Sequence, residues 1–298
     1  MDVSVIIVNY NTCLLTLQCL NSIYNKSEDI NFEIILIDNA SIDNSVEIIK
    51  KEFPKINLIC SSENLGFGRA NNIGINQAHG KYVFLLNSDT ILLNNAIKIF
   101  FDYFEKNNLK GNMGAAGCIM FDKNMNLNYR NSYFSFPSIS LFYKESLKRI
   151  FKMPKNKYNA ESIIIEKTGQ IQVDFIVGAD LFIPKNIINV IGSFDPDYFM
   201  YWEEVDLQFR MKKKNFDRCI ISGPEIIHLE GGSSEKNVKD LQRRMETQSL
   251  LTYFRKHTNL LSVFLIKTHL LIINIKSVLL NKYTLGEHLE YFKLILKI

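Results

Sequence analysis

Three polar residues, Asn87, Ser88 and Asp89, follow directly after a continuous apolar run at residues 82–86. Such a run predicts a strand buried on both faces, and the polar cluster after it favours a turn or a helix cap. In an open parallel sheet, ligands bind beyond the carboxyl ends of the strands. Asp89 could therefore hold Mg²⁺ or Mn²⁺ against a phosphate. The alternative interpretation is an N-cap for a helix that starts near Asn94.

A second group of acids lies at the start of a predicted helix. Glu203, Glu204 and Asp206 stand there beside Trp202, the single tryptophan of the chain. Carboxylates near a helix N-terminus are favourable by about 0.3–1 kcal/mol each, and Asp206 has the i, i+4 spacing of an ion pair with Arg210. The functional alternative is a general base that faces a pocket, with a pKa raised by the like charges around it.

His228 ends a short apolar stretch, and Gly231 and Gly232 follow it. A single histidine is more often structural than a ligand. At a strand end, however, imidazole and a carboxylate such as Asp89 can complete a divalent-metal site. Both interpretations stay open on the sequence alone.

Two sets of small residues suggest close approach to a ligand. Gly178 and Ala179, with Asp180 after them, follow a mainly apolar stretch at residues 173–177 that predicts a strand, and they would leave room for a substrate. The stretch 66–71 has glycine at its first and third positions but asparagine at its sixth. We therefore reject a dinucleotide-binding fingerprint there and expect these glycines to bend the loop toward a ligand.

Strands and helices alternate over the first third of the chain. The predicted strands lie at 3–8, 33–37, 56–60 and 82–86, with helices between them, including one at 45–52. This alternation gives βαβ units, and hence a parallel sheet with right-handed crossovers. Each of the four strands ends in a polar cluster, so their ends would together form a ligand-binding rim. Residues 122–170 are predicted to be a variable excursion over one edge.

The composition excludes several classes of protein. With 298 residues, 47% of them apolar, the chain can bury a substantial core. A net charge of +4 from 35 basic and 31 acidic residues is too balanced to suggest nucleic-acid binding. The five cysteines form no C-x-x-C pair, which favours a reducing compartment over disulfides or zinc. The N-terminal residues show no basic region or cleavage site, so no export signal is expected.

The tail, residues 251–298, has a different composition. It carries seven lysines and arginines against two glutamates, a balance of +5. Lysines interrupt its apolar stretches too often for a transmembrane helix, and the apolar positions do not sort cleanly onto one face. We favour a membrane-surface helix with snorkelling lysines. The alternative is packing against the rest of the chain or against a second subunit.

Together these motifs resemble the inverting glycosyltransferases of family 2, which have a GT-A fold. Within that family they are similar to the rhamnosyltransferase-type enzymes of bacterial O-antigen and capsule synthesis. The residues that carry the resemblance are, in chain order, 3–11, 37–43, 63–72, 86–89, 178–179, 192–195, 202–210 and 228–233. The tail is not covered by these motifs.

The resemblance implies an α/β fold with a Rossmann-like, mainly parallel central sheet flanked by helices. Residues 1–95 would form the half that binds the nucleotide sugar, and residues 96–250 would form the acceptor-binding half of the same domain. Residues 251–298 would form a basic, apolar, helical tail that associates with a membrane.

The resemblance also implies a donor site. Its nucleotide-sugar-binding residues would be Val8, Tyr10, Asp38, Asn64, Arg69, Asn87, Ser88 and Asp89. Val8 and Tyr10 would flank the nucleobase, and Asp38 would accept its imide N–H. Asp89 and His228 would bind the Mg²⁺ or Mn²⁺ that bridges the diphosphate.

The acceptor side follows from the same resemblance. Glu204 falls at the position of the catalytic base, with Glu203 next to it as the alternative base. The acceptor and sugar pocket would be lined by Gly178, Ala179, Asp180 and Trp202.

Two positions depart from the family pattern. Asn87 replaces the first acid of the D-x-D motif, so metal binding would depend on Asp89 and His228. Glu204 stands where aspartate is usual, and its extra methylene changes the reach by about 1.5 Å.

The sequence thus predicts an inverting, metal-dependent glycosyltransferase. It would move L-rhamnose from dTDP-L-rhamnose, or a sugar from a UDP-hexose, to a saccharide on polyprenyl diphosphate. The inner-membrane surface, on its cytoplasmic face, is the expected location, and a homodimer is left open. A nucleotidyltransferase is disfavoured, because residues 9–12 are not the glycine- and basic-rich loop of that class. A catalytically silent membrane scaffold with the same fold is the second rival.

Overall fold

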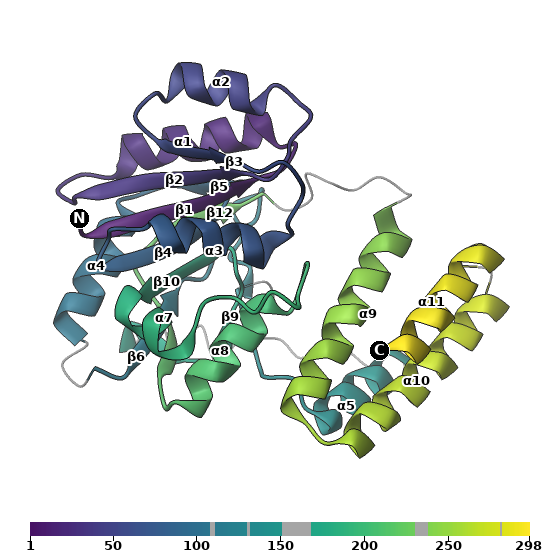
Figure 1. Ribbon diagram of the computed structural model, residues 1–298. Helices are drawn as coiled ribbons and strands as arrows, with labels where there is room; N and C mark the ends of the chain where they lie inside the picture. Colours follow the sequence, from purple (N-terminus) through teal and green to yellow (C-terminus); the bar gives the residue numbers. More distant parts are fainter. Residues whose placement is uncertain (108–110, 130–131, 151–167, 230–237, 281) are drawn as a thin grey trace. The chain divides into compact units, whose positions relative to one another are not determined.

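A computed structural model of the chain describes residues 1–107, 111–129, 132–150, 168–229, 238–280 and 282–298 (Figure 1). The chain divides into two compact units. The sheet unit comprises Met1–Phe136, Asn156–Asp195 and Glu204–Gly232, and the helical unit comprises Pro137–Lys155, Pro196–Glu203 and Ser233–Ile298. The expected boundary at residue 250 falls inside a continuous helix, α9 (Val238–His257). The observed division therefore differs from the expected one there.

An eight-stranded sheet forms the centre of the sheet unit, in the order β3-β2-β1-β4-β10-β6-β11-β8. Its strands are β1 (Val3–Asn9), β2 (Phe32–Asp38), β3 (Asn57–Cys60), β4 (Tyr82–Asn87), β6 (Met113–Gly117), β8 (Gln170–Gln172), β10 (Asp180–Pro184) and β11 (Asp217–Ile221). The first four strands are parallel neighbours, as predicted. β10 runs antiparallel between β4 and β6, which makes the sheet mixed.

Helices cover both faces of this sheet (Figure 1). They are α1 (Cys13–Lys26), α2 (Ser45–Glu52), α3 (Phe67–Gln77), α4 (Ala96–Asn107), α7 (Lys185–Ile191) and α8 (Glu203–Lys213). Side chains alternate along β1, so Val5 and Ile7 pack in a core with α1, α2 and α4, whereas Ile6 packs with α3, α7 and α8. Burial on both faces explains why the parallel strands are continuous apolar runs.

Two small sheets correct the sequence analysis. β5 (Thr90–Leu92) pairs antiparallel with β12 (Ile226–His228), and β5 was not predicted. Because residues 90–92 are a strand and α4 begins only at Ala96, the helix-cap interpretation of Asp89 is wrong. The strand expected at 173–177 is also wrong as one element. Only Phe175–Ile176 (β9) is a strand there, and it pairs with β7 (Tyr133–Phe134) outside the main sheet.

The helical unit contains α5 (Ile139–Ile150), α9, α10 (Leu260–Leu279) and α11 (Leu285–Lys297). Asn259 caps α10 by accepting a hydrogen bond from the backbone of Ser262, and Thr284 forms a capping box with Glu287 at α11. These caps explain why two separate helices form in the predicted tail. Gly231 and Gly232, singled out in the sequence, lie outside the described residues.

Candidate active site

The predicted rim exists at the carboxyl ends of β1, β2 and β4. Register pairs Val8 with Asn87 and Asn9 with Asp38, so these residues of separate segments lie in one row. Parallel strands end at the same edge of a sheet, which is why the sequence could anticipate this row.

Asn9 is the centre of a buried polar network at this edge, and the sequence analysis gave it no role. Its amide nitrogen donates to Asp38 Oδ1 at 2.8 Å and to Ser41 Oγ at 3.0 Å. Its amide oxygen accepts from Thr12 at 2.9 Å and from Thr16 at 2.7 Å. All four hydrogen-bonding positions of the amide are used, which rigidifies the loops after β1 and β2.

Asp38 is already engaged within the protein. Besides the bond from Asn9, its Oδ2 accepts the backbone N–H of Ser41 at 3.0 Å, and the residue is 2% exposed. A carboxylate oxygen can accept a second bond, so contact with a nucleobase stays a prediction. Tyr10, by contrast, is 46% exposed at the same edge and is open to a ligand.

Asn64 and Arg69 occupy the loop and first turn of α3. Asn64 Oδ1 accepts from Asn39 Nδ2 and from the backbone N–H of Gly66, both at 2.9 Å. Gly66 has φ of 80°, a conformation that favours glycine, so this loop is bent as expected. Asn64 therefore shapes the loop, while Arg69 is exposed just after it. A nucleotide contact for either residue stays a prediction.

Asp89 and His228 are brought together, as the sequence predicted. Thr90 is paired with His228 in the β5–β12 ladder, which places His228 next to Asp89. Asp89 Oδ1 lies 3.2 Å from His228 Nε2, and Asn87 Nδ2 lies 3.5 Å from the same nitrogen. Ser88 Oγ, on the loop between them, lies 3.2 Å from Thr12 Oγ1.

These residues fit a divalent cation. Two ligands in adjacent positions of an octahedral ion, at about 2.1 Å each, stand about 3 Å apart, close to the separation of Asp89 and His228. Asn87 Oδ1 is buried and has no hydrogen-bond partner among the described residues, and a half-turn of the amide would bring it to the place of Nδ2 as a third oxygen. No group of three histidine, cysteine or acidic side chains suited to a metal occurs in the described part of the chain.

Glu204 faces Gly178 within the sheet unit. A Cβ atom at Gly178 would stand 3.5 Å from Glu204 Cβ and 3.5 Å from Phe67 Cε1. Burial raises the pKa of the Glu204 carboxyl. Glu204 thus has the environment expected of a general base. Gly178 has no side chain, so the space beside Glu204 is not filled from that position. Phe67 was not predicted, and its position directly after Gly66 was the signal that was overlooked.

The other two acids of α8 differ from Glu204. Asp206 is 1% exposed and its Oδ2 accepts from Arg210 Nε at 2.8 Å, which confirms the structural interpretation of that pair. Arg210 also donates to the carbonyls of Ile191 and Ser193, at 2.6 and 2.8 Å. The pair therefore fastens the end of α7 to α8. Glu203 is 3% exposed and groups with the helical unit, so its role as an alternative base stays a prediction.

Trp202 belongs to the helical unit. Its ring lies 5.4 Å from that of Tyr253 and 6.3 Å from that of Phe254, both on α9. Tyr201 and Trp202 have φ of 68° and 70°, which is costly for bulky residues. Such strain is found where a turn must hold a side chain in a defined place, but a contact of Trp202 with a sugar stays a prediction.

Gln208 is a positioning residue that the sequence did not reveal. It is fully buried, accepts the N–H of Ile176 at 2.8 Å and donates to the carbonyl of Ile176 at 2.7 Å. It also donates to the carbonyl of Glu204 at 3.2 Å. One amide thus joins α8 to the strand that precedes Gly178 and fixes Glu204 against it.

Ala179 and Asp180 are fully buried. Asp180 Oδ2 accepts the backbone N–H of Cys118 at 2.7 Å, and Oδ1 has no hydrogen-bond partner among the described residues. Burial raises the pKa of the Asp180 carboxyl to about 7. Because neither residue is exposed, their place in a sugar pocket stays a prediction.

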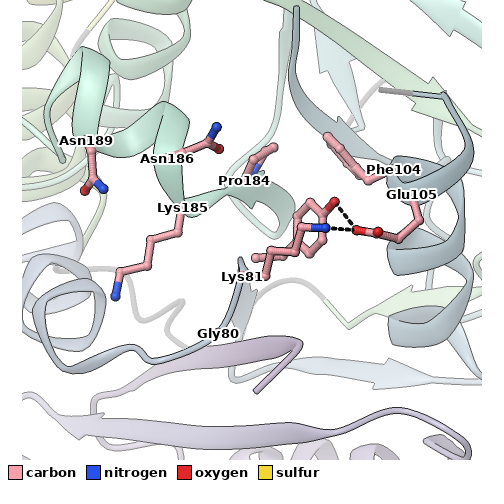
Figure 2. Close-up of a pocket in the computed structure, with 9 residues that line it drawn as sticks. Gly80, Lys81, Phe104, Glu105, Pro184, Lys185, Asn186 and Asn189 are labelled. Carbon is pink, nitrogen blue, oxygen red and sulfur yellow. Dashed lines mark hydrogen bonds and ion pairs between the residues drawn. The ribbon is translucent and has the colours of Figure 1, made fainter. Parts of the chain in front are cut away.

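A pocket of about 630 Å³ lies elsewhere in the sheet unit (Figure 2). Lys81 and Tyr82, at the start of β4, line it with Pro184, at the end of β10. There Glu105 accepts from Lys81 Nζ at 2.5 Å and from the Tyr82 hydroxyl at 2.6 Å. The pocket is thus at the opposite end of β4 from Asn87, and it contains none of the predicted site residues.

Curated proteins provide an independent comparison. Residues 4–165 match the family model described as glycosyl transferase family 2. An uncharacterized glycosyltransferase of Rickettsia bellii is 35% identical over 108 residues, which are 36% of this chain and 15% of that protein. One of Haemophilus influenzae is 35% identical over 114 residues, 36% and 44% of the two chains. The poly(ribitol-phosphate) β-N-acetylglucosaminyltransferase TarS of Staphylococcus aureus is 31% identical over 117 residues, 37% and 18%.

The match thus spans less than half the length of each of these relatives. Among solved structures, GalNAc-T7 with UDP, GalNAc and Mn²⁺ superposes with a TM-score of 0.58 at 14% identity, over 82% of this chain and 48% of that one. S. aureus TarS 1–349 superposes with a TM-score of 0.51 at 16% identity, over 86% and 72%. Likenesses at this identity show the fold, which is GT-A as predicted. The family-model match covers more than half of the sequence, and the chain therefore belongs to glycosyltransferase family 2.

Proposed function

We propose that the protein is an inverting, metal-dependent glycosyltransferase. Its donor would be dTDP-L-rhamnose, and its acceptor a saccharide carried on polyprenyl diphosphate at the cytoplasmic face of the inner membrane. The observation that carries the proposal is the 3.2 Å approach of Asp89 and His228 at the strand-end rim, where a donor diphosphate would lie. The likeness to GalNAc-T7, which was crystallised with UDP and Mn²⁺, supports the use of a nucleotide sugar and a divalent metal.

Asp89 and His228, with Asn87 Oδ1, would hold Mg²⁺ or Mn²⁺. When bound, such an ion neutralises charge on the departing diphosphate. Arg69, exposed in the first turn of α3, would add positive charge for the nucleotide. Asn9 and its network would keep the loops after β1 and β2 in place, so that binding does not have to order them.

Glu204 would accept the proton of the acceptor hydroxyl as that oxygen attacks the sugar. A pKa raised by burial makes the carboxylate a stronger base than an exposed glutamate, and it is a base only above that pKa. With one base on the acceptor side, direct displacement needs no carboxylate nucleophile, and it would invert the configuration of the transferred sugar.

The comparison with TarS suggests a second candidate donor and a second candidate acceptor. That relative is named for transfer of N-acetylglucosamine to poly(ribitol-phosphate), and it matches both in sequence and in fold. A UDP-hexose donor with a polyol-phosphate acceptor is therefore the alternative to rhamnosyl transfer.

The test is a donor panel with purified protein. Hydrolysis and transfer would be measured for dTDP- and UDP-sugars, with Mn²⁺, with Mg²⁺ and with chelator, against lipid-linked and polyol-phosphate acceptors. We expect metal-dependent turnover of one donor, lost in Asp89→Ala and retained in the matched surface variant Asp29→Ala. Nucleotide binding without turnover of any donor would support the silent scaffold instead. Release of pyrophosphate from a nucleoside triphosphate would support a nucleotidyltransferase.

A further inference from the structure

The buried face of helix α10 is more polar than the buried face of a helix in a water-soluble protein. Its buried side chains recur at three- and four-residue spacing and are Ser262, Ile266, Leu270, Asn274 and Ser277. Three of these five are polar. A helix on a soluble domain normally buries its apolar face and exposes its polar one.

Large apolar side chains are exposed on α10 and α11. On α10 they include Leu261, Phe264, Ile272, Ile275 and Leu279, and on α11 they are Leu285, Leu289, Phe292 and Leu296. These side chains are between 41% and 78% exposed. Their spacing of three, four or seven residues, or sums of these, places each set on one face of its helix. We call these two sets the apolar stripes.

Polar contacts fix the inner sides of the same helices. Asn274 Oδ1 lies 2.8 Å from His288 Nδ1, which joins α10 to α11. The Tyr291 hydroxyl lies 2.9 Å from Thr247 Oγ1, which joins α11 to α9, and both contacts are buried. The guanidinium of Arg243 stacks 4.0 Å from the centre of the Tyr291 ring. Because buried polar groups need these partners, neither helix can rotate its apolar stripe inward without losing them.

Buried polar side chains and exposed apolar stripes are the pattern expected of helices whose outer faces contact lipid. Between helices in a membrane, small and polar residues make the contacts, and apolar residues face outward. Contiguous exposed apolar surface is unfavourable in water and marks an interaction site. Within the described part of the chain, α10 is also the helix that is long and apolar enough to cross a membrane by length and composition.

Charge identifies the kind of lipid. On the helical repeat, Lys267 and Lys276 lie on opposite flanks of the α10 stripe, each about a quarter-turn away. The two acids of α11 are already engaged, Glu287 in the capping box with Thr284 and Glu290 with Lys293 at 2.9 Å. Lysines beside an apolar stripe place their ammonium groups at the level of lipid phosphates.

We propose that α10 and α11 lie in the plane of an anionic phospholipid bilayer, with both apolar stripes in the acyl region and the flanking lysines at the phosphates. An in-plane position follows because Lys267 and Lys276 lie within α10, where a membrane-spanning orientation would carry their charges into the acyl region. The proposal deepens the proposed function, since a lipid-linked acceptor lies at such a surface. Its test measures lipid binding without any sugar transfer.

The experiment is flotation of the full-length protein with vesicles of phosphatidylcholine alone and of phosphatidylcholine with phosphatidylglycerol. The stripe variant is Phe264→Gln/Ile272→Gln/Ile275→Gln, and its matched control is Leu241→Gln, an exposed leucine of α9 that is 49% exposed. We expect the wild type and the control to float with the anionic vesicles. The stripe variant should lose at least about tenfold in partitioning. Lys267→Gln/Lys276→Gln should bind anionic vesicles more weakly and lose most of the preference for them over neutral ones.

Circular dichroism and thermal melting would show that each variant is folded, and metal-dependent nucleotide binding would show that its sheet unit is intact. Equal partitioning of the stripe variant and the control would overturn the proposal. So would wild-type protein that stays unbound while sedimenting as a dimer, if the stripe variant is a monomer, because the stripes would then cover a second copy. Loss of sugar transfer with unchanged flotation would count against the proposed function alone.

Discussion

The two units of this chain differ in the side chains that they expose. In the sheet unit, apolar strands are covered by helices on both faces, and polar side chains collect at the strand ends. In the helical unit, Asn274, His288 and Thr247 are buried while leucines, isoleucines and phenylalanines are exposed on α10 and α11. In both units some of the buried polar groups are paired with one another, as Asn9 is with Asp38 and Asn274 with His288. This contrast is the basis of our proposal that the exposed apolar side chains of α10 and α11 face lipid.

The largest expected effect concerns chemistry, which we place in the sheet unit. Glu204→Gln keeps the size of the side chain but removes the base, so the rate of transfer should fall by about 10²–10⁴-fold. Steady-state kinetics with the donor found in the panel would measure it. Glu52→Gln, at the end of α2, is the matched control and should change nothing. An active Glu204→Gln enzyme would move the base elsewhere, and Glu203→Gln would then be the next variant.

Removal of a phenylalanine ring should lower the stability strongly in the sheet unit and hardly at all in the helical unit. Phe182 is fully buried, with its ring 5.3 Å from that of Phe100, and Phe182→Ala should lower the free energy of unfolding by about 3–5 kcal/mol. Phe264 is 64% exposed, and Phe264→Ala should change the stability in lipid-free buffer by no more than about 0.5 kcal/mol. Urea unfolding of both variants would measure this. If both variants lost a similar free energy of unfolding, Phe264 would have to be buried in solution, and the stripe would not be exposed.

Asp180 is an exception inside the sheet unit, because it is a buried acid whose Oδ1 has no hydrogen-bond partner among the described residues. Its pKa is raised to about 7, above the ordinary 3.8, so the folded state keeps a proton that the unfolded state has lost. The free energy of unfolding should therefore fall as pH rises between about 4 and 7, by at most about 4 kcal/mol. Cys118 and His228 are the titratable groups that act on this carboxyl.

Asp180→Asn cannot titrate, so its stability should gain on that of the wild type as pH rises through this range. Thermal melting of both proteins at several pH values would measure the gap. A gap that is constant with pH would mean that Asp180 is ionised in the folded protein throughout.

A smaller effect is expected from the polar contact inside the helical unit. Asn274→Ala leaves His288 without its 2.8 Å partner and should cost about 1–3 kcal/mol. Thr268→Ala is the matched control on the exposed side of α10 and should lie within about 0.5 kcal/mol of the wild type. If both variants are equally stable, the buried polar contact does not hold the stripes outward, and the contrast between the units weakens.

The sequence by itself determined the local elements and the row of strand ends. Apolar runs and turn residues are local signals, and they placed β1, β2 and β4 to within one residue at each end and α2 without error. The resemblance carried by the motifs gave the family and the GT-A fold, both of which the comparisons show. It also singled out Asp89, His228, Gly178 and Glu204, which the structure brings together in two pairs.

Only the tertiary structure decided which distant segments meet. The pairing of β5 with β12 puts His228 beside Asp89, and the insertion of β10 between β4 and β6 mixes the sheet. Gln208 could not be recognised, because its two bonds to Ile176 depend on a strand far away in sequence. In α10 the apolar residues alone did not define a face. The buried face of α10 is defined by the contact of Asn274 with His288. A buried polar group needs a partner, and the sequence alone does not show which residue that partner is.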